Sequence, residues 1–432
     1  MKKFLIFLLV PTVFMALFVA CQAAPAEKGS GNDNGEPKEI RVFLPEHPYA
    51  DLLIPLLPEF EEKTGITVIM EQMNENELTE KQLEGIATGT QVADVFMTRP
   101  ATETLRFLEN NWMMPLNGFD FSDFPANTAE IGLKDGIPHY IPLVIEWHTL
   151  FYRKDLLENA GLSVPTTIEE LEEAAKILNR GGVAGFASRG AGFPAVSQIS
   201  SFIYNYGGRY IEDGRAVFDS PEAVDAIRTY GRILGVSGPN GINEMSWSEI
   251  MSIFQAGNLA MWTDASVFYS QLIDPEHSQI PPEHVGVASF PRGPAADEAY
   301  IITGWGMSIS SMTEDVDSAV AFLTWATSRE IAEKAMLVNI PMARLSVWND
   351  PAITTHLSPE MVATMLHASE FGFPYVMPLM TSIFQARELI GEVISESINT
   401  RGTSPRLQEL ATQKTEEVND LLKADGEYGT AR

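Results

Sequence analysis

The chain has 432 residues, of which 45% are apolar and 9% aromatic, so it is long enough for two or three domains with large cores. Its 29 Lys and Arg residues against 58 Asp and Glu residues give a net charge of −29, which would repel a polyanion; we expect no nucleic-acid partner. A single cysteine excludes an internal disulfide and a cysteine-based zinc or iron–sulfur site.

The N-terminus has the pattern of an export signal. Lys2 and Lys3 precede an uncharged apolar run, Phe4–Ala20, and Cys21 follows directly. The alternative is a membrane-spanning helix, but this run is short for a hydrocarbon core of ~30 Å and Pro11 interrupts it. We therefore predict that residues 1–21 are a lipoprotein signal peptide rather than part of the fold.

Residues 18–21, with the sequence FVAC, resemble a lipobox, in which the cysteine is acylated and becomes the first mature residue. The alternative is ordinary cleavage near residues 24–26, followed by release. Residues 22–38 have almost no aliphatic side chain larger than Ala and read as a flexible tether. Either cleavage means export; with acylation of Cys21, a lipid anchor would hold the protein at the outer face of the cytoplasmic membrane or in the periplasm.

From residue 39 the hydrophobic pattern predicts a β-α-β-α-β order, which implies a parallel sheet. The expected strands cover residues 40–44, 66–69 and 93–97, and the expected helices residues 52–60 and 77–89. Ligands of such sheets bind beyond the carboxyl ends of the strands. Glu46 and His47 follow the first strand and Arg99 follows the third, so we predict that these three side chains bind a ligand.

Further along, the pattern predicts helices at 167–178, 221–234, 246–256 and 407–422, and strands at 259–262 and 285–288. The sequence has no G-x-S-x-G, H-E-x-x-H or P-loop motif, and its seven histidines are scattered, so we expect no cofactor and no metal site. Carboxylates for glycoside hydrolysis stay open as an alternative, because Glu46, Glu146 and Asp264 could converge in space.

Several stretches, in order, resemble the extracellular solute-binding proteins of carbohydrate ABC transporters, the group of maltose-binding and polyol-binding proteins. They are LPEFEEKTGI (57–66), ADVF (93–96), LFYRKDLL (150–157), RGAG (189–192), MWTDAS (261–266), FPRGP (290–294), GWGMSI (304–309) and PMAR (341–344). The resemblance implies an α/β fold of the two-lobed periplasmic-binding-protein type (type II). It also implies three hinge crossings, an N-lobe of residues 38–139 and 308–343, and a C-lobe of residues 142–304 and 345–432.

A sugar presents hydroxyl groups at its edge and C–H groups on its faces, so its site needs charged or amide groups beside aromatic rings. Glu146 and Trp147 lie near the first expected crossing, Trp305 near the second and Arg344 near the third. We predict that they meet the ligand on closure; the alternative is hinge packing by the rings and a Glu146–Arg344 ion pair.

Asp264 ends a predicted strand, where its carboxylate could accept two hydroxyl groups; the alternative is a helix N-cap. Arg189 precedes Gly190, which permits close approach of a ligand. The remaining tryptophans are expected in the core or on a subunit surface; they are Trp112, Trp247, Trp262, Trp325 and Trp348.

Together these features predict a monomeric binding protein, not an enzyme, that captures a sugar, oligosaccharide or polyol and delivers it to an ABC permease. The alternatives are an exported glycoside hydrolase, or the same fold with a non-sugar solute.

Overall fold

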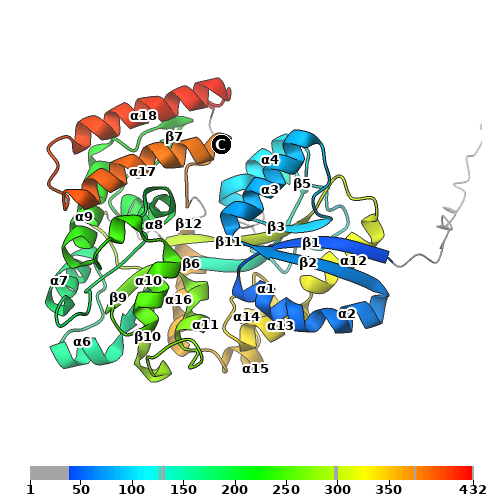
Figure 1. Ribbon diagram of the computed structural model, residues 1–432, viewed down its shortest axis with the longest axis horizontal. Coiled ribbons are helices and arrows are strands. Elements are labelled where there is room, and N and C mark those ends of the chain that lie inside the picture. Colours follow the sequence, from blue (N-terminus) through cyan, green and yellow to red (C-terminus); the bar gives the residue numbers. More distant parts are fainter. Residues whose placement is uncertain (1–37, 126–127, 129–131, 296–299, 374–375, 431–432) are drawn as a thin grey trace, which may run out of the picture. The chain divides into compact units, whose positions relative to one another are not determined.

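A computed structural model describes residues 38–125, 128, 132–295, 300–373 and 376–430. The predicted signal peptide, Cys21 and nearly all of the predicted tether lie outside these residues. Among the described residues, eight strands form one mixed sheet with the order β10-β6-β11-β3-β1-β2, to which β9 adds through β6 and β12 through β11 (Figure 1).

The strands are β1 (Lys38–Pro45), β2 (Ile66–Met73), β3 (Val95–Thr98), β4 (Leu133–Lys134), β5 (Ile137–Pro138), β6 (Ile141–Arg153), β7 (Ile211–Glu212), β8 (Arg215–Ala216), β9 (Met261–Ala265), β10 (Val285–Ser289), β11 (Tyr300–Ile309) and β12 (Gly372–Phe373). The α-helices before β11 are α1 (Pro48–Leu53), α2 (Leu57–Thr64), α3 (Glu75–Thr88), α4 (Leu105–Glu109), α6 (Lys154–Ala160), α7 (Ile168–Leu178), α8 (Gly192–Asn205), α9 (Pro221–Ser237), α10 (Trp247–Gln255) and α11 (Tyr269–Leu272).

The α-helices after β11 are α12 (Val316–Ala326), α13 (Arg329–Leu337), α14 (Leu345–Trp348), α15 (Pro351–Thr354), α16 (Pro359–Phe371), α17 (Ile383–Asn399) and α18 (Leu407–Ala424). Short helical turns are η1 (Ile54–Leu56), η2 (Pro100–Thr104), η3 (Ile242–Glu244), η4 (Ser266–Phe268) and η5 (Pro282–His284).

We call β1, β2 and β3 the first half-sheet. β1 pairs in parallel with both β2 and β3, as the β-α-β-α-β pattern predicts. Helices cover both faces, with α3 and α4 on one and α1, α2, α12 and α13 on the other (Figure 1). The carboxyl ends of these strands therefore open on one edge, where Glu46, His47 and Arg99 follow them.

Two long strands, β6 and β11, join the first half-sheet to the second, which consists of β9 and β10. β11 pairs with β3 through residues 306–309 and with β6 through residues 302–307. The second part of β6 pairs with β9 and β10. The segment 341–343 runs beside β6, where the amide of Ile145 donates to Pro341 O and that of Ala343 donates to Leu143 O. Three chain segments thus lie side by side where the two half-sheets meet.

Gly304 allows β6 and β11 to approach closely. Its φ is +150°, and an added Cβ would lie 1.9 Å from the carbonyl oxygen of Val144. The pairing register shifts directly afterwards, between Trp305 and Gly306. Such an irregularity changes the direction in which a side chain projects from the strand. The side chain at this position is that of Trp305.

The second half of the protein is rich in helices. Helix α7 begins at a capping box, in which Thr167 accepts from the amide of Glu170 and the Glu170 carboxylate accepts from the amide of Thr167. Helices α8, α9 and α17 pack together, and α18 packs on α17 and α9 (Figure 1).

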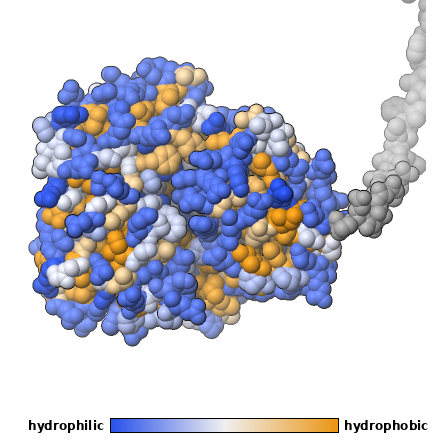
Figure 2. Space-filling view, viewed as in Figure 1, coloured by the Kyte–Doolittle hydropathy of each residue, from blue (hydrophilic) through white to orange (hydrophobic). Residues whose placement is uncertain are grey.

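The face of the protein in Figure 2 is mostly hydrophilic, with apolar side chains scattered over it. In the part of the chain that the structure describes, no helix combines the length and the apolar character needed to cross a membrane.

Candidate functional site

A cavity of about 520 Å³, part of it open to solvent, lies beside the first half-sheet. On its other side are the loop before α8, the start of α10, and η4 with α11. Its lining residues come from both sides and from the joining strands: Pro45, Glu46, His47, Pro48, Asn74, Glu75, Glu146, Arg189, Trp247, Val267, Phe268, Gln271 and Trp305. Five of the predicted ligand-binding residues, Glu46, His47, Glu146, Arg189 and Trp305, therefore meet at one cavity.

His47 connects the first half-sheet to the joining strand β6. Its Nδ1 accepts a hydrogen bond of 3.0 Å from the amide of Tyr49, which caps α1. The proton of the neutral ring therefore sits on Nε2, which donates to Oε1 of Glu146 at 3.2 Å. Both side chains are buried, so this bond fixes the direction of the Glu146 carboxylate at the cavity wall.

Trp305 is held between two charged or polar groups. The ring of His47 meets it edge-on, with centroids 6.0 Å apart and planes at 65°. The guanidinium carbon of Arg99 lies 5.5 Å from the centroid of the Trp305 ring. These contacts fix the indole, which is 7% exposed, at the edge of the cavity.

Arg99 forms ion pairs with acidic residues that follow the strands of the first half-sheet. Its Nε donates to Glu103 Oε2 at 3.1 Å, its Nη1 lies 3.3 Å from Glu75 Oε2, and its Nη2 donates to the hydroxyl of Thr79 at 2.9 Å. Burial raises the pKa of Glu103, and Arg99 opposes that rise. Arg99 does not line the cavity, but it supports Glu75 and Trp305, which do.

Asp264 and Arg189 form a two-point ion pair on the opposite side. Arg189 Nη2 donates to Oδ1 at 2.7 Å and its Nε to Oδ2 at 3.0 Å. Gln198 and the amide of Ala265 also donate to Asp264, which is fully buried. Burial raises the pKa of Asp264 although Arg189 opposes this. Asp264 does not line the cavity: it orients Arg189, which does.

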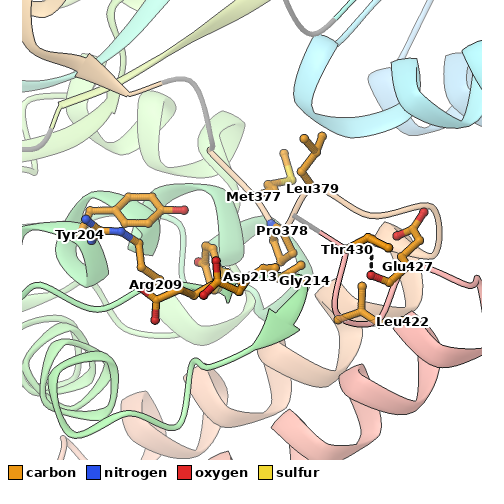
Figure 3. Close-up of a pocket in the computed structure, with 13 residues that line it drawn as sticks. Tyr204, Arg209, Asp213, Gly214, Met377, Pro378, Leu379, Leu422, Glu427 and Thr430 are labelled. Atoms are coloured by element: carbon orange, nitrogen blue, oxygen red, sulfur yellow. Dashed lines mark hydrogen bonds between the residues drawn. The ribbon is translucent and has the colours of Figure 1, made fainter. Parts of the chain in front are cut away.

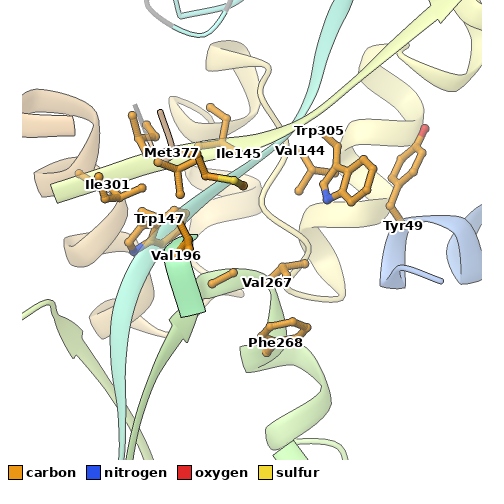
Figure 4. Close-up of a cluster of buried hydrophobic side chains, with 14 of the residues drawn as sticks. Tyr49, Val144, Ile145, Trp147, Val196, Val267, Phe268, Ile301, Trp305 and Met377 are labelled. Atoms are coloured by element: carbon orange, nitrogen blue, oxygen red, sulfur yellow. The ribbon is translucent and has the colours of Figure 1, made fainter. Parts of the chain in front are cut away.

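Besides Arg99 and Asp264, two more predicted residues, Trp147 and Arg344, do not line the cavity. Trp147 is fully buried, beside Val196 and Ile301 (Figure 4), and meets Trp348 edge-on at 6.4 Å. Arg344 donates to Asp123 at 2.9 Å and to the carbonyl of Thr327 at 2.6 Å. The Glu146–Arg344 pair considered as an alternative is not formed, because each has its own partner.

The cavity also contains residues that the sequence did not single out. Trp247, expected in the core or on a subunit surface, is half-buried and stacks on Phe268, with centroids 5.1 Å apart and planes at 17°. Asn74 and Glu75 follow β2, so the strand-end rule that selected Glu46 and Arg99 would have found them too. Burial tends to raise the pKa of Glu75, but Arg99 and then Arg189 lower it overall.

A larger cavity, of about 850 Å³, lies among the β7–β8 hairpin, the residues before α17 and the end of the chain (Figure 3). Tyr204, Arg209, Asp213, Met377 and Leu422 are among its lining residues. None of the predicted site residues lines it, so we assign the candidate site to the smaller cavity. Within the described ranges, no group of three or more His, Cys, Asp or Glu side chains is placed to hold a metal ion.

Comparisons with known proteins identify the family of the chain. Residues 47–333, more than half of the chain, match the family described as bacterial extracellular solute-binding protein. The mannitol-binding protein of Pseudomonas aeruginosa is 27% identical over 79% of this chain and 84% of its own length. The erythritol/L-threitol-binding protein of Mycolicibacterium smegmatis is 24% identical over 69% of this chain and 68% of its own.

Solved structures share the fold. A solute-binding protein from Agrobacterium radiobacter in complex with ribitol superimposes with a TM-score of 0.81 at 24% identity, covering 89% of this chain and 99% of that one. One from Agrobacterium vitis with bound D-mannitol gives 0.80 at 23% identity, covering 90% and 99%. The protein therefore has the two-lobed α/β fold of periplasmic binding proteins. The family match over residues 47–333 further identifies it as a solute-binding protein and not a glycoside hydrolase. The chain belongs to the bacterial extracellular solute-binding proteins.

Proposed function

We propose that the protein captures a polyol or sugar in the cavity lined by His47, Glu146, Arg189 and Trp305 and delivers it to an ABC permease. The observation that carries this proposal is the meeting of an indole with fixed hydrogen-bonding groups from both sides of one cavity. Relatives named for mannitol and for erythritol or L-threitol support the choice of ligand class.

The chemistry of the wall suits a polyhydroxylated ligand. Carboxylate oxygens of Glu46, Glu75 and Glu146 can accept hydrogen bonds from hydroxyl groups, and Arg189 can donate to them. Trp305, Trp247 and Phe268 offer apolar faces for C–H groups. Hydrogen bonds already orient the charged groups. The side chains therefore lose less conformational entropy when the ligand binds.

Capture and release follow from the position of the cavity beside the joining segments. Bending of β6, β11 and residues 341–343 would open and close the cavity, which is the usual hinge motion of two-lobed binding proteins. The predicted lobes, residues 38–139 with 308–343 and residues 142–304 with 345–432, stay a prediction. A Kd near ~1 μM would suit both capture and release.

Export and anchoring complete the proposal. Cys21, at the end of an apolar N-terminal run, would carry the lipid, and the tether of residues 22–38 would let the binding domain move near the permease. A monomer would suffice for this role.

A thermal-shift screen of purified protein against D-mannitol, ribitol, D-tagatose, maltose and longer oligosaccharides tests the function. A ligand at 100 times its Kd stabilises the folded state by about 2.7 kcal/mol, so the melting temperature should rise with at least one compound. The proposal fails if no sugar or polyol raises it while an unrelated solute, such as an amino acid, does.

A further inference from the structure

Gln271, on α11, lines the cavity with a side-chain amide that makes no hydrogen bond to the described residues. Its Oε1 is buried and has no partner there. Its Nε2 has no partner among these residues either, although it is not buried. A buried polar atom without a hydrogen bond is uncommon in a folded protein and calls for an explanation.

The other hydrogen-bonding side chains of the lining differ from Gln271 in this respect. Most of the charged, imidazole and amide groups there bond to a neighbouring residue; they belong to His47, Asn74, Glu75, Glu146 and Arg189. Glu46 makes no such bond, but its side chain is exposed, so water can satisfy the carboxylate. Gln271 is half-buried and keeps its amide unsatisfied at the wall of the cavity.

The backbone of Gln271 is fixed, whereas its amide is free to turn. The carbonyl oxygen of Gln271 accepts a hydrogen bond of 3.1 Å from Nε2 of Gln255, which ties α11 to the end of α10. Val267 and Phe268 line the same cavity about one turn earlier, and Phe268 stacks on Trp247. Rotation about the last side-chain bond exchanges the two ends of the amide, so either end can be presented to the cavity. The α11 wall therefore offers one neutral hydrogen-bonding group beside apolar faces.

We propose that Gln271 is a specificity-determining residue, whose amide forms a hydrogen bond with a hydroxyl group of the ligand. This inference rests on the proposed function and adds a requirement to it: the ligand must present an uncharged hydroxyl group at the α11 wall. A hydroxyl group both donates and accepts, as an amide does, so the two can pair in either orientation of the amide. A ligand with only C–H groups at this point would leave the amide unpaired and would bind more weakly.

Gln271→Met tests the hydrogen bond, because methionine keeps the length of the side chain and removes both ends of the amide. Calorimetric titrations would use D-mannitol, ribitol, D-tagatose and maltose. Each compound that binds the wild type should bind the variant about five- to tenfold more weakly. The melting temperature of the ligand-free protein should stay the same or rise, since a buried polar atom without a partner is lost. A residue that only supports the wall would instead lower the melting temperature.

Gln279→Met is the matched control. Gln279 is exposed and does not line the cavity, so the same substitution there should leave affinity and melting temperature unchanged. Gln271→Asn covers the case in which Gln271→Met does not fold. It keeps the amide but withdraws it by one methylene group, and it should weaken binding by a similar factor.

A second series removes hydroxyl groups from the ligand. D-Mannitol has twofold symmetry, so its 1,6-, 2,5- and 3,4-dideoxy derivatives each lose one equivalent pair of hydroxyl groups, whichever way round the ligand binds. For the derivative that lacks the hydroxyl group at Gln271, the wild type and Gln271→Met should bind with equal affinity. For the other two derivatives, the variant should stay about five- to tenfold weaker.

Three results would overturn the inference: equal affinity of the wild type and Gln271→Met for every compound that binds, the same loss with all three dideoxy derivatives, or a fall in the melting temperature of ligand-free Gln271→Met. If D-mannitol does not bind the wild type, the comparison on the compound that does bind decides. Binding without any role of Gln271 would leave the proposed function intact. The absence of binding by every sugar and polyol of the screen would refute the proposed function as well.

Discussion

Charged side chains around the cavity bond to one another before any ligand is present. His47 donates to Glu146, Arg99 holds Glu75, and Asp264 holds Arg189 in a two-point contact. Both His47 and Glu146 face the cavity, whereas the other two pairs each leave one partner there, Glu75 and Arg189, whose direction is fixed by the other. At the scale of single residues, the site is a set of oriented pairs rather than of free charges, which lowers the entropy lost on binding.

The Arg189–Asp264 pair should be strongly coupled. Asp264→Asn leaves Arg189, whose side chain is only 12% exposed, without its counter-charge, and we expect a loss of about 3 kcal/mol in the free energy of unfolding, measured in urea. The double variant Arg189→Met, Asp264→Leu removes both charges and should recover much of that loss. Additive effects of Arg189→Met and Asp264→Leu would contradict the coupling.

His148 should make stability fall in acid. Its Nδ1 lies 2.6 Å from the hydroxyl of Ser201, and burial, followed by Arg189, lowers the pKa of His148 to about 3. Between this value and the ordinary value of 6.5, the unfolded chain gains a proton that the folded protein does not. The contribution of His148 should therefore lower the free energy of unfolding by about 1.4 kcal/mol per pH unit as the pH drops from 6.5 towards 3.

His148→Gln removes the titrating ring. Urea unfolding at pH 7, 5 and 4 should show a shallower decline for this variant than for the wild type, because other acid-sensitive groups are common to both. Parallel declines would mean that His148 does not titrate as its burial implies.

Sequence alone selects residues of the cavity lining where a local rule applies, and their role in binding stays a prediction. Glu46 and His47 directly follow a strand, so the strand-end rule selects them. Trp305 lies near a predicted chain crossing, where an aromatic ring suits a sugar. Glu75 obeys the same strand-end rule, because it lies two residues after β2. Trp247 could not be predicted this way, because its position at the cavity depends on packing between elements that are distant in sequence.

At the scale of elements, the joining strands decide the geometry of the site. β6 carries Glu146 and β11 carries Trp305, and the close approach of these strands depends on Gly304. Periodicity predicted most elements within a few residues, including β1, β2, β3 and α9, since each has its own apolar pattern. The register shift after Trp305 depends on pairing between strands and leaves no such pattern.

Gly304→Ala should disrupt the joining strands. The alanine would have to adopt a φ near +150°, and its Cβ would lie 1.9 Å from the Val144 carbonyl oxygen. We therefore expect a loss of at least about 2 kcal/mol in the free energy of unfolding. Gly118→Ala is the control, because Gly118 has a φ of +89° and no neighbouring atom within 4 Å of an added Cβ. Equal losses for the two variants would show that the approach of β6 and β11 is not tight.

In the whole molecule, we propose that an N-terminal lipid anchor at Cys21 precedes the two-lobed binding domain. The signal peptide, the tether and Cys21 are proposed from the sequence, and the ligand cavity from the arrangement of residues 38–430. The large negative net charge keeps the protein soluble and discourages binding to anionic surfaces.

Cys21 should determine attachment to the membrane. After expression in a bacterial host and cell fractionation, the wild type should be found with membranes and should incorporate labelled fatty acid. Cys21→Ala should do neither. Labelling of Cys21→Ala, or a wild type found wholly in the soluble fraction, would exclude the lipid anchor.

Calorimetric titration of Trp305→Ala tests whether the cavity at Trp305 holds the ligand. The titrant is the compound that raises the melting temperature of the wild-type protein most. Loss of the indole should weaken binding by about 2 kcal/mol or more, about thirtyfold in Kd. Trp112→Ala is the control, because Trp112 packs against Phe96 and Phe107 in the core of the first half-sheet and should affect melting temperature rather than affinity. Wild-type affinity in Trp305→Ala would contradict the account.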